Sequence, residues 1–271
     1  MNYNLDAELV FDKFLGNSNV LDDLQRLLVK HAQRWARRVR IWKGPGDEIP
    51  VELNGSAALR RAVVQAATER GSSYETLVAK YGPGDERLQG SAEMHGHDSG
   101  LIVVVRIDQK PLARFAGRLL LGNAISFQIR HPRIEDRPAE EWAATMMGDA
   151  CALMSPVWAS ARTTEEYQAK VMRNGNAAGR DFSRFLPGLF WLNFFGAPYV
   201  ATIGPDKLEA VPALHKPIDS GILIQLHSDP SAWTSPEYRT VEERVRNSIG
   251  SDFFFSKAAA ASRSRAPEFA H

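Results

Sequence analysis

Cysteine is nearly absent from this chain of 271 residues, which contains Cys151 alone. A single cysteine cannot form an internal disulfide, a cysteine-rich zinc site or a CxxC redox pair, so these three features are excluded. An excess of one charge is also lacking, because 33 Lys and Arg residues balance 32 Asp and Glu residues to a net charge of +1. General nucleic-acid binders are usually strongly basic, so we expect no nucleic-acid partner.

Long apolar runs are missing as well. The runs present are short, as at residues 101–105, 119–121 and 253–255, whereas a membrane-spanning helix needs about 20 apolar residues. Acidic residues at positions 6, 8 and 12 interrupt the apolar stretch that a signal peptide would need near the N-terminus. We therefore expect no membrane association and a cytoplasmic location.

Common catalytic signatures are lacking too, since the sequence has no GxSxG, HExxH, GxGxxG or GxxxxGK[ST] motif. Cys151 lies in an apolar stretch and is expected to be a buried small residue. Adjacent carboxylates at 140–141, 165–166 and 242–243 fall where first helical turns are expected, where they complement the helix dipole. His95 and His97 supply only half of a zinc site. We predict a protein that is not an enzyme and holds no metal or cofactor.

Hydrophobic periodicity predicts both helices and strands. A period near 3.6 residues predicts helices over residues 17–35, 56–70, 138–154 and 235–248, and Thr163 is a candidate cap for one more. Alternation or β-branched composition predicts strands over 38–42, 87–95, 101–108, 123–130, 157–161 and 222–226. These elements form no regular βαβ repeats, which favours an α+β fold with a mixed or mainly antiparallel sheet and helices packed on one side. Two fused α+β subdomains are the alternative architecture.

The chain is divided here into three parts. Residues 1–80 are expected to form an N-terminal helical and strand portion of an α+β domain, and residues 81–256 the larger α+β portion. Residues 257–271 are rich in Ser, Arg and Ala and are expected to be a disordered tail.

The segment at residues 26–43 carries seven Lys and Arg residues and no acidic residue, with Trp35 and Trp42 interleaved. This composition fits a surface that meets an acidic protein partner, and it equally fits a solvated helix face leading into an edge strand. A second distinctive run, GLFWLNFFGAPY at 188–199, brings five large aromatic residues. Such a run is typical of a core, or of a binding hot spot if it is exposed.

We chose candidate partner-binding residues outside the expected core. They combine the basic segment, the Asn- and Gly-rich loop at 174–179 and a tryptophan between two prolines: Arg34, Arg37, Arg38, Arg40, Asn174, Asn176 and Trp233.

Several segments together resemble a known family. FWLNFFGAPYV at 190–200 is followed by IGPDKL at 203–208, GILIQL at 221–226 and IGSDFFF at 249–255, with NAISF at 123–127 and PVWA at 156–159 upstream. Over residues 87–255 the chain is similar to the immunity protein 52 family of bacterial polymorphic-toxin and type VI secretion systems. The resemblance implies an α+β protein that binds a cognate toxin, often a nuclease, and occludes its active site inside the producing cell. The shared segments are structural and aromatic, so they transfer no toxin-contacting residue.

Two further functions stay open at this stage. One is an enzyme with a dispersed site, in which the basic segment at 34–43 would hold an anionic substrate. The other is an adaptor that binds nucleic acid through its basic helix.

Overall fold

The computed structural model describes residues 4–13, 15–17, 19–37, 39–44, 47–53, 58–67, 89–96, 100–108, 112–115, 118–121, 123–173, 176–177, 182, 184–255, 266–267 and 269. Its main feature is a ten-stranded sheet. The strands are β1 (Leu5–Phe11), β2 (Val39–Gly44), β3 (Asp47–Val51), β4 (Gln89–His95), β5 (Leu101–Asp108), β8 (Asn123–Ile129), β11 (Trp158–Thr163), β14 (Leu192–Gly196), β15 (Leu214–Ile218) and β16 (Gly221–Gln225).

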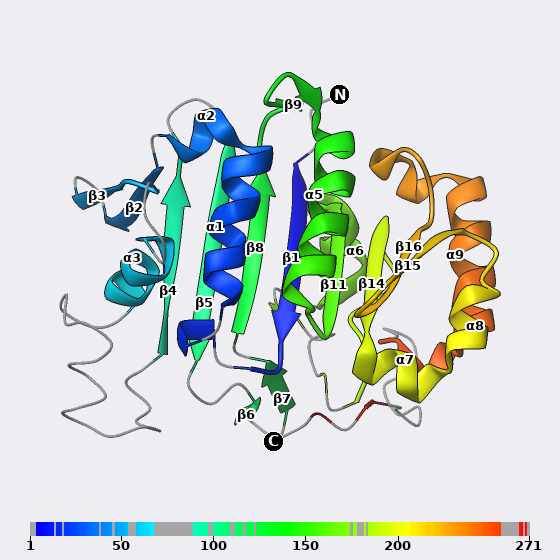
Figure 1. The fold of residues 1–271 in the computed structure, drawn as a ribbon. Helices are drawn as coiled ribbons and strands as arrows, with labels where there is room; N and C mark the ends of the chain where they lie inside the picture. Colours follow the sequence, from blue (N-terminus) through cyan, green and yellow to red (C-terminus); the bar gives the residue numbers. More distant parts are fainter. Residues whose placement is uncertain are drawn as a thin grey trace.

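The strand order is β15-β16-β14-β11-β1-β8-β5-β4-β2-β3, and neighbouring strands are antiparallel throughout (Figure 1). Strands from residues 1–80 and from residues 81–256 thus share one sheet, and β1 lies in its middle. Three small hairpins accompany it: β6 (Leu112–Phe115) with β7 (Arg118–Leu121), β9 (Arg133–Ile134) with β10 (Arg137–Pro138), and β12 (Met172–Arg173) with β13 (Asn176–Ala177). The predicted α+β class and mainly antiparallel sheet are confirmed.

One face of the sheet carries the first core. Helices α1 (Val20–His31), α3 (Ala58–Ala67) and α5 (Ala139–Met154) cover this face, with α2 (Gln33–Ala36) and η1 (Leu15–Asn17) at its ends (Figure 1). Alternate strand residues point into this core, including Ala7, Val103 and Phe127, because successive side chains of a strand leave opposite faces. Trp142 of α5 packs edge-to-face on Phe127 with ring centroids 6.4 Å apart.

The opposite face carries a second core, which lies over β11, β14 and β16 and includes Val10 near the end of β1. It is covered by α6 (Thr164–Val171), α7 (Ala197–Ile203), α8 (Pro205–Glu209), α9 (Pro236–Ile249), η3 (Pro230–Thr234) and η4 (Ser251–Phe253). The expectation that helices pack on one side was therefore wrong. The reason is that β11 and β14 are buried along their whole length, so that Trp158 and Phe195 need cover opposite the first core.

Local signals placed most helices correctly. The Thr163 hydroxyl caps α6 by accepting a hydrogen bond from the Glu166 N–H at 3.1 Å. The Ser235 hydroxyl caps α9 in the same way, by accepting a hydrogen bond from the Tyr238 N–H at 3.1 Å. The predicted helix at 17–35 is instead divided at Ala32 into α1 and α2. Strands β1 and β15 were not predicted.

The aromatic run at 188–199 lies in the core of the protein, so of its two interpretations, core or exposed binding hot spot, the first is correct. Phe190, Trp191, Phe194 and Phe195 are each 0–1% exposed.

One residue of the tail at 257–271, which we expected to be disordered, is packed against the fold. Phe269 is buried and lies edge-to-face on Tyr199, with ring centroids 6.1 Å apart. Among the helices that the structure describes, none is long and apolar enough to cross a membrane.

Candidate partner-binding surface

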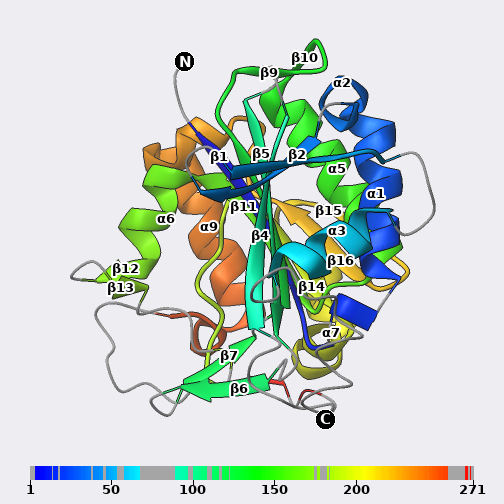
Figure 2. The ribbon, with the colours of Figure 1, turned by 90° about the vertical axis from the view of Figure 1, so that its left-hand side faces the viewer.

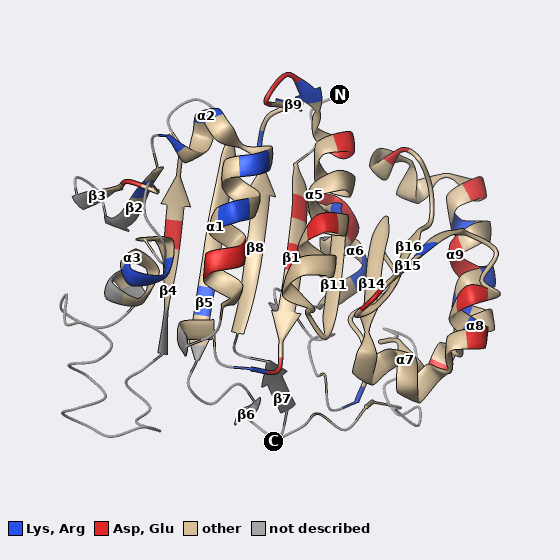
Figure 3. Ribbon diagram, in the orientation of Figure 1, with Lys and Arg blue, Asp and Glu red and all other residues tan. Residues whose placement is uncertain are grey.

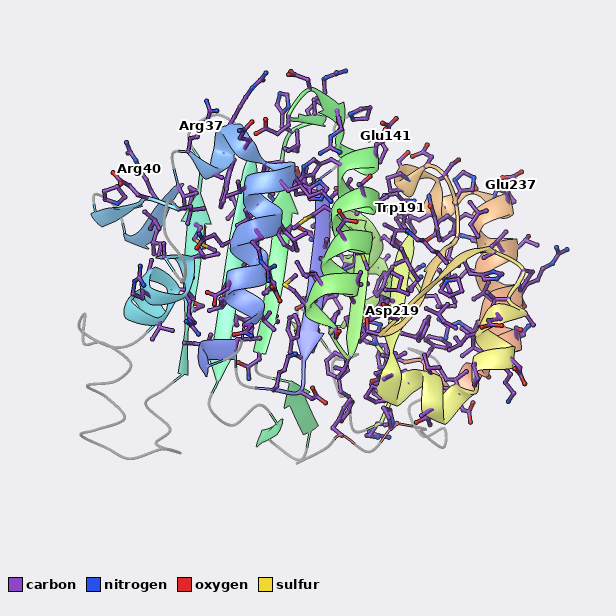
Figure 4. All side chains as sticks on the ribbon, in the orientation of Figure 1. Arg37, Arg40, Glu141, Trp191, Asp219 and Glu237 are labelled. Carbon is purple, nitrogen blue, oxygen red and sulfur yellow. The ribbon has the colours of Figure 1, made fainter. Side chains whose placement is uncertain are left out.

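Three of the predicted arginines, Arg34, Arg37 and Arg40, lie at one end of the molecule but differ in their surroundings (Figure 4). Arg34 of α2 is exposed, and its Nη2 donates to Asp136 Oδ2 at 2.7 Å. The Arg34 backbone N–H also donates to Glu135 Oε1 at 2.6 Å. The acidic β9–β10 turn therefore neutralises Arg34 and binds the amino end of α2, whereas the sequence alone shows no acidic residue near it.

Arg37 and Arg40 lie on different sides of this end. Arg37 follows α2, is exposed and forms no ion pair with any residue that the structure describes. Arg40 is exposed on β2, and its side chain leaves the face of the sheet opposite α1. Figure 4 labels both at the same end of the molecule. Arg38 lies outside the described residues.

The other predicted residues are elsewhere. Asn174 lies outside the described residues, and Asn176 begins β13 with its side chain undescribed. Trp233 of η3 is partly buried against the second core. η3 contacts β11, which lies five strand spacings, or about 24 Å, from the strand β2 that carries Arg40. The structure does not bring the seven predicted residues together into one site.

A different surface stands out in the structure. The helices lie on both sides of the sheet, with α1, α3 and α5 on one side and α6 and α9 on the other (Figure 2). Strands β8, β5, β4 and β2 have the first core on one face and no described helix over the other, and β1 lies at the border, where Val10 belongs to the second core. We call the side chains on that side the open face: Asp6, Glu8, Arg40, Ser91, Glu93, His95, Ile102, Val104, Arg106, Ser126, Gln128 and Arg130.

The register of the sheet places these residues in rows. Arg40 pairs with His95, His95 with Ile102, Ile102 with Gln128, and Gln128 with Asp6. Directly paired residues of antiparallel strands point to the same side, so this row crosses five strands on one face. Farther along the sheet the same side becomes apolar and buried beneath α6 and α9. One sheet face thus has a buried half and an open half.

Glu8 lies at the border between these halves and joins two arginines. It is only 4% exposed. Its carboxylate accepts from Arg106 Nη2 through one oxygen and from Arg162 Nη2 through the other, at 3.2 Å. Arg162 is itself buried, donates to Ser160 Oγ and lies 4.5 Å from the centroid of the Tyr167 ring.

The remaining charges of the open face are also paired. Asp6 accepts from Thr164 Oγ1 at 2.7 Å and lies 3.3 Å from Arg130 Nη1. Glu93 Oε1 and His95 Nε2 are 2.8 Å apart, and both side chains are 38% exposed. Acidic and basic groups therefore alternate over this surface. The helix-covered side also mixes the two signs, since acidic and basic positions of α1 and α5 lie side by side (Figure 3).

At the centre of the open face lie two apolar side chains. Ile102 and Val104 of β5 are half-buried, with Glu93, Gln128 and Arg106 as polar neighbours in the paired rows. An apolar centre with a polar rim is the usual composition of a protein–protein interface. The open face can therefore hold a protein partner through both apolar contact and ion pairs.

A second charged cluster is enclosed between α6 and α9. Lys170 Nζ donates to Glu166 Oε1 at 2.7 Å and lies 2.9 Å from Glu242 Oε2, and the Tyr238 hydroxyl donates to Glu166 at 2.7 Å. Burial raises the pKa of the Glu166 carboxyl, and burial together with Glu166 raises that of Tyr238. Glu166 is 0% exposed, so we assign this cluster to joining the two helices. Within the described residues, no group of three His, Cys, Asp or Glu is placed to hold a metal ion.

Comparison with solved structures shows a likeness of fold. The fold is similar to that of the Pseudomonas aeruginosa T6SS protein PA0821, with a TM-score of 0.52 and 13% sequence identity. The alignment covers 97% of this chain and 79% of the solved chain. At that identity the likeness shows a shared fold. No family model matches the sequence, and no curated protein does.

Sequence reasoning missed the open face except for Arg40, although a signal for it was present. Alternate residues of β4, β5 and β8 belong to the first core: Ala92 and Met94 in β4, every second residue from Leu101 to Ile107 in β5, and every second residue from Ile125 to Ile129 in β8. Among the intervening residues are polar ones such as Glu93, Arg106 and Gln128, a pattern typical of an antiparallel sheet with one solvated face.

Proposed function

We propose that this protein is an immunity protein of a type VI secretion system, which binds a cognate toxin and blocks its active site. The observation that carries the proposal is the open face, a rigid sheet surface with an apolar centre and paired charges at its rim. The fold shared with a protein that is itself called a T6SS protein supports the secretion context. The segments that resemble the immunity protein 52 family support the neutralising role.

The family-like segments have a structural part in this function. Phe190, Trp191 and Phe194 lie in the cores rather than at the surface. They hold β14 in the sheet between β16 and β11. Strand β11 in turn pairs with β1, at the border of the open face. Toxin recognition then belongs to surface residues, which can differ between proteins that share these core segments.

The dimensions of the open face fit a protein partner. Four strand spacings from β1 to β2 give about 19 Å across, and six to seven residues along β5 give about 20 Å, or roughly 400 Å². Each partner of a standard interface buries about 800 Å². The toxin would therefore also contact a flank of the open face, such as α6 or the end that carries Arg37.

Coexpression tests the proposal directly. The protein encoded beside this chain in its genome would be expressed in a heterologous host, with and without the full chain. We expect growth arrest by the neighbour alone, restored growth with this chain, and a 1:1 complex by size-exclusion chromatography with light scattering. A matched control is Trp191→Ala, which removes a buried core side chain and should abolish protection by unfolding the protein.

Two results would overturn the proposal. One is a neighbour that does not affect growth when expressed alone. The other is growth arrest that this chain, present as soluble folded protein, does not relieve.

A further inference from the structure

We propose that the open face binds its partner through an acidic side chain that docks beside Arg106, with an aliphatic side chain next to it on Ile102 and Val104. This inference rests on the proposed function and adds the chemistry of the partner. It depends on four features of the described residues: a carboxylate shared by two arginines, the charge of the open face, its apolar centre, and the prolines in the two edge strands.

The first feature is that two guanidinium groups share one carboxylate. Arg106 and Arg162 both donate to Glu8, which is 5% exposed at its side chain. Arg162 is 6% exposed at its side chain, and its Nε has no hydrogen-bond partner among the residues that the structure describes. Together, Arg106, Arg162 and Glu8 carry a net charge of +1. Since the Arg106 side chain is 40% exposed, that charge is accessible at the open face.

The second feature is the charge of those open-face side chains that the structure describes. Together with Arg162 beneath them, they comprise four arginines and three carboxylates. A partner carboxylate would give Arg106 a second acceptor and would balance the cluster. Charge-assisted pairs of arginine with carboxylate are strong and directional, because the guanidinium fork matches the two oxygens.

The third feature distinguishes a protein from a nucleic acid. Val104 lies in the row next to that of Arg106, and Ile102 lies one row farther along β5, so an anion bound at Arg106 has apolar surface on the same face. A phosphate backbone offers no aliphatic group for that surface, whereas an Asp or Glu beside a Leu, Ile or Val does. The open face therefore fits an acidic protein segment.

The fourth feature is that both edge strands discourage strand addition. The outermost strands β3 and β15 each contain a proline, Pro50 and Pro217. Ile218 pairs with Gly221 across a two-residue turn, so residues 214, 216 and 218 bond to β16 and Pro217 turns its nitrogen to the open edge. A proline there cannot donate to an added strand. The partner would thus meet the face of the sheet.

A second copy of this chain fits the face less well than an acidic partner. In a two-fold symmetric contact the same patch faces itself, so the excess positive charge around Arg106 would meet its like. Juxtaposed like charges disfavour such a contact. We therefore commit to an acidic partner segment as the occupant.

The experiment compares three variants in binding to the toxin encoded beside this chain, made catalytically inactive. Arg106→Glu reverses the exposed charge, and Ile102→Asp places a carboxylate in the apolar centre without touching Glu8. Arg61→Glu, on exposed α3 behind the first core, is the matched control. Thermal melts would verify that each variant is folded.

We expect Arg106→Glu to slow association about tenfold or more at low salt, with a smaller effect at high salt, because steering by charge is screened by ions. Ile102→Asp should raise the Kd about tenfold or more at either salt concentration, and Arg61→Glu should bind as the wild type does. If the wild type neutralises the toxin while folded Arg106→Glu and Ile102→Asp bind it equally well, the inference is wrong and the proposed function stands. If sedimentation shows a dimer that Ile102→Asp separates, the occupant is a second copy and the inference is likewise wrong.

Discussion

Glu8 and Arg106 form an ion pair although a whole strand, β8, lies between the strands that carry them. Two strand spacings are about 9.6 Å, which only a long side chain can cross. The residues of β8 beneath this crossing are small: Ser126 pairs with Glu8, and Ala124 pairs with Arg106. The small side chains leave room for the arginine to lie across them, and the pair connects three strands of the open face.

Removing this carboxylate should destabilise the protein strongly. Glu8→Gln leaves Arg162 buried with its charge uncompensated, and breaking a buried pair in this way costs about 3–5 kcal/mol. Urea denaturation would measure the loss in the free energy of unfolding. Glu93→Gln is the control, because the Glu93–His95 pair is 38% exposed on both sides and should change that free energy by less than about 1 kcal/mol. Equal effects of the two substitutions would show that Glu8 is not a buried link.

The cap of α6 can be tested with a single hydroxyl. Thr163→Ala removes the acceptor for the Glu166 N–H, and the loss of such a cap costs about 0.5–2 kcal/mol. Thr163→Ser keeps the hydroxyl and should recover most of the stability in thermal or chemical unfolding. A Ser variant as unstable as the Ala variant would mean that the methyl group of Thr163, which is buried, matters more than its oxygen.

Acid should weaken the contact between α1 and α5. A hydrogen bond from Lys30 at 2.6 Å, with a smaller contribution from His31, lowers the pKa of the Asp149 carboxyl below its usual range, against the opposing effect of burial. Because the folded pKa is the lower one, the carboxylate stabilises the fold above the pKa of the unfolded chain. That contribution disappears as the pH falls through the folded value.

We therefore expect wild type to be more stable than Asp149→Asn near neutral pH, with a difference that shrinks in acid below the usual aspartate range. Denaturation curves at several pH values would show this. Asp219→Asn, at the exposed β15–β16 turn, is the control for replacing an aspartate away from the α1–α5 contact. A gap between wild type and Asp149→Asn that grows in acid would contradict the assignment.

Two glycines should respond oppositely to alanine. A Cβ at Gly196 would lie 2.3 Å from the Pro156 carbonyl oxygen and 2.7 Å from that of Val157, so backbone would have to move. Gly196→Ala should destabilise by about 1–3 kcal/mol. A Cβ at Gly148, inside α5, would have Leu223 as its nearest neighbour at 4.0 Å. Gly148→Ala should stabilise by about 0.5–1 kcal/mol, since alanine favours the helix. Thermal melts of both variants check the signs.

Local sequence patterns predicted most of the secondary structure. Helix α5 and strands β4, β5 and β8 lie within one or two residues of their predicted bounds, because their apolar periodicity and flanking turns agree. Strand β1 was missed although Leu5, Ala7, Leu9 and Phe11 alternate with Asp6 and Glu8. Its position between β8 and β11 depends on partners more than a hundred residues away, which no local pattern specifies.

The candidate site was harder to predict, for a physical reason. A run of positive charge in sequence does not show which charges the fold will pair. Asp136 and Glu135 neutralise Arg34 from a turn a hundred residues later. Arg106 and Arg130 lie far from Arg40 in the sequence, and only the register of β2, β4, β5 and β8 places them on the same face of the sheet. Alternation showed which side chains face outward, but not that the helices leave this side uncovered.

The central place of β1 has a consequence for synthesis of the chain. This strand is synthesised well before its two neighbours in the sheet, residues 123–129 and 158–163. Until residues 123–129 have emerged from the ribosome, neither neighbour of β1 exists, and its apolar side chains wait for the strands that will cover them. A nascent chain that stops before residue 123 therefore carries β1 without either of the strands that hold it in the middle of the sheet.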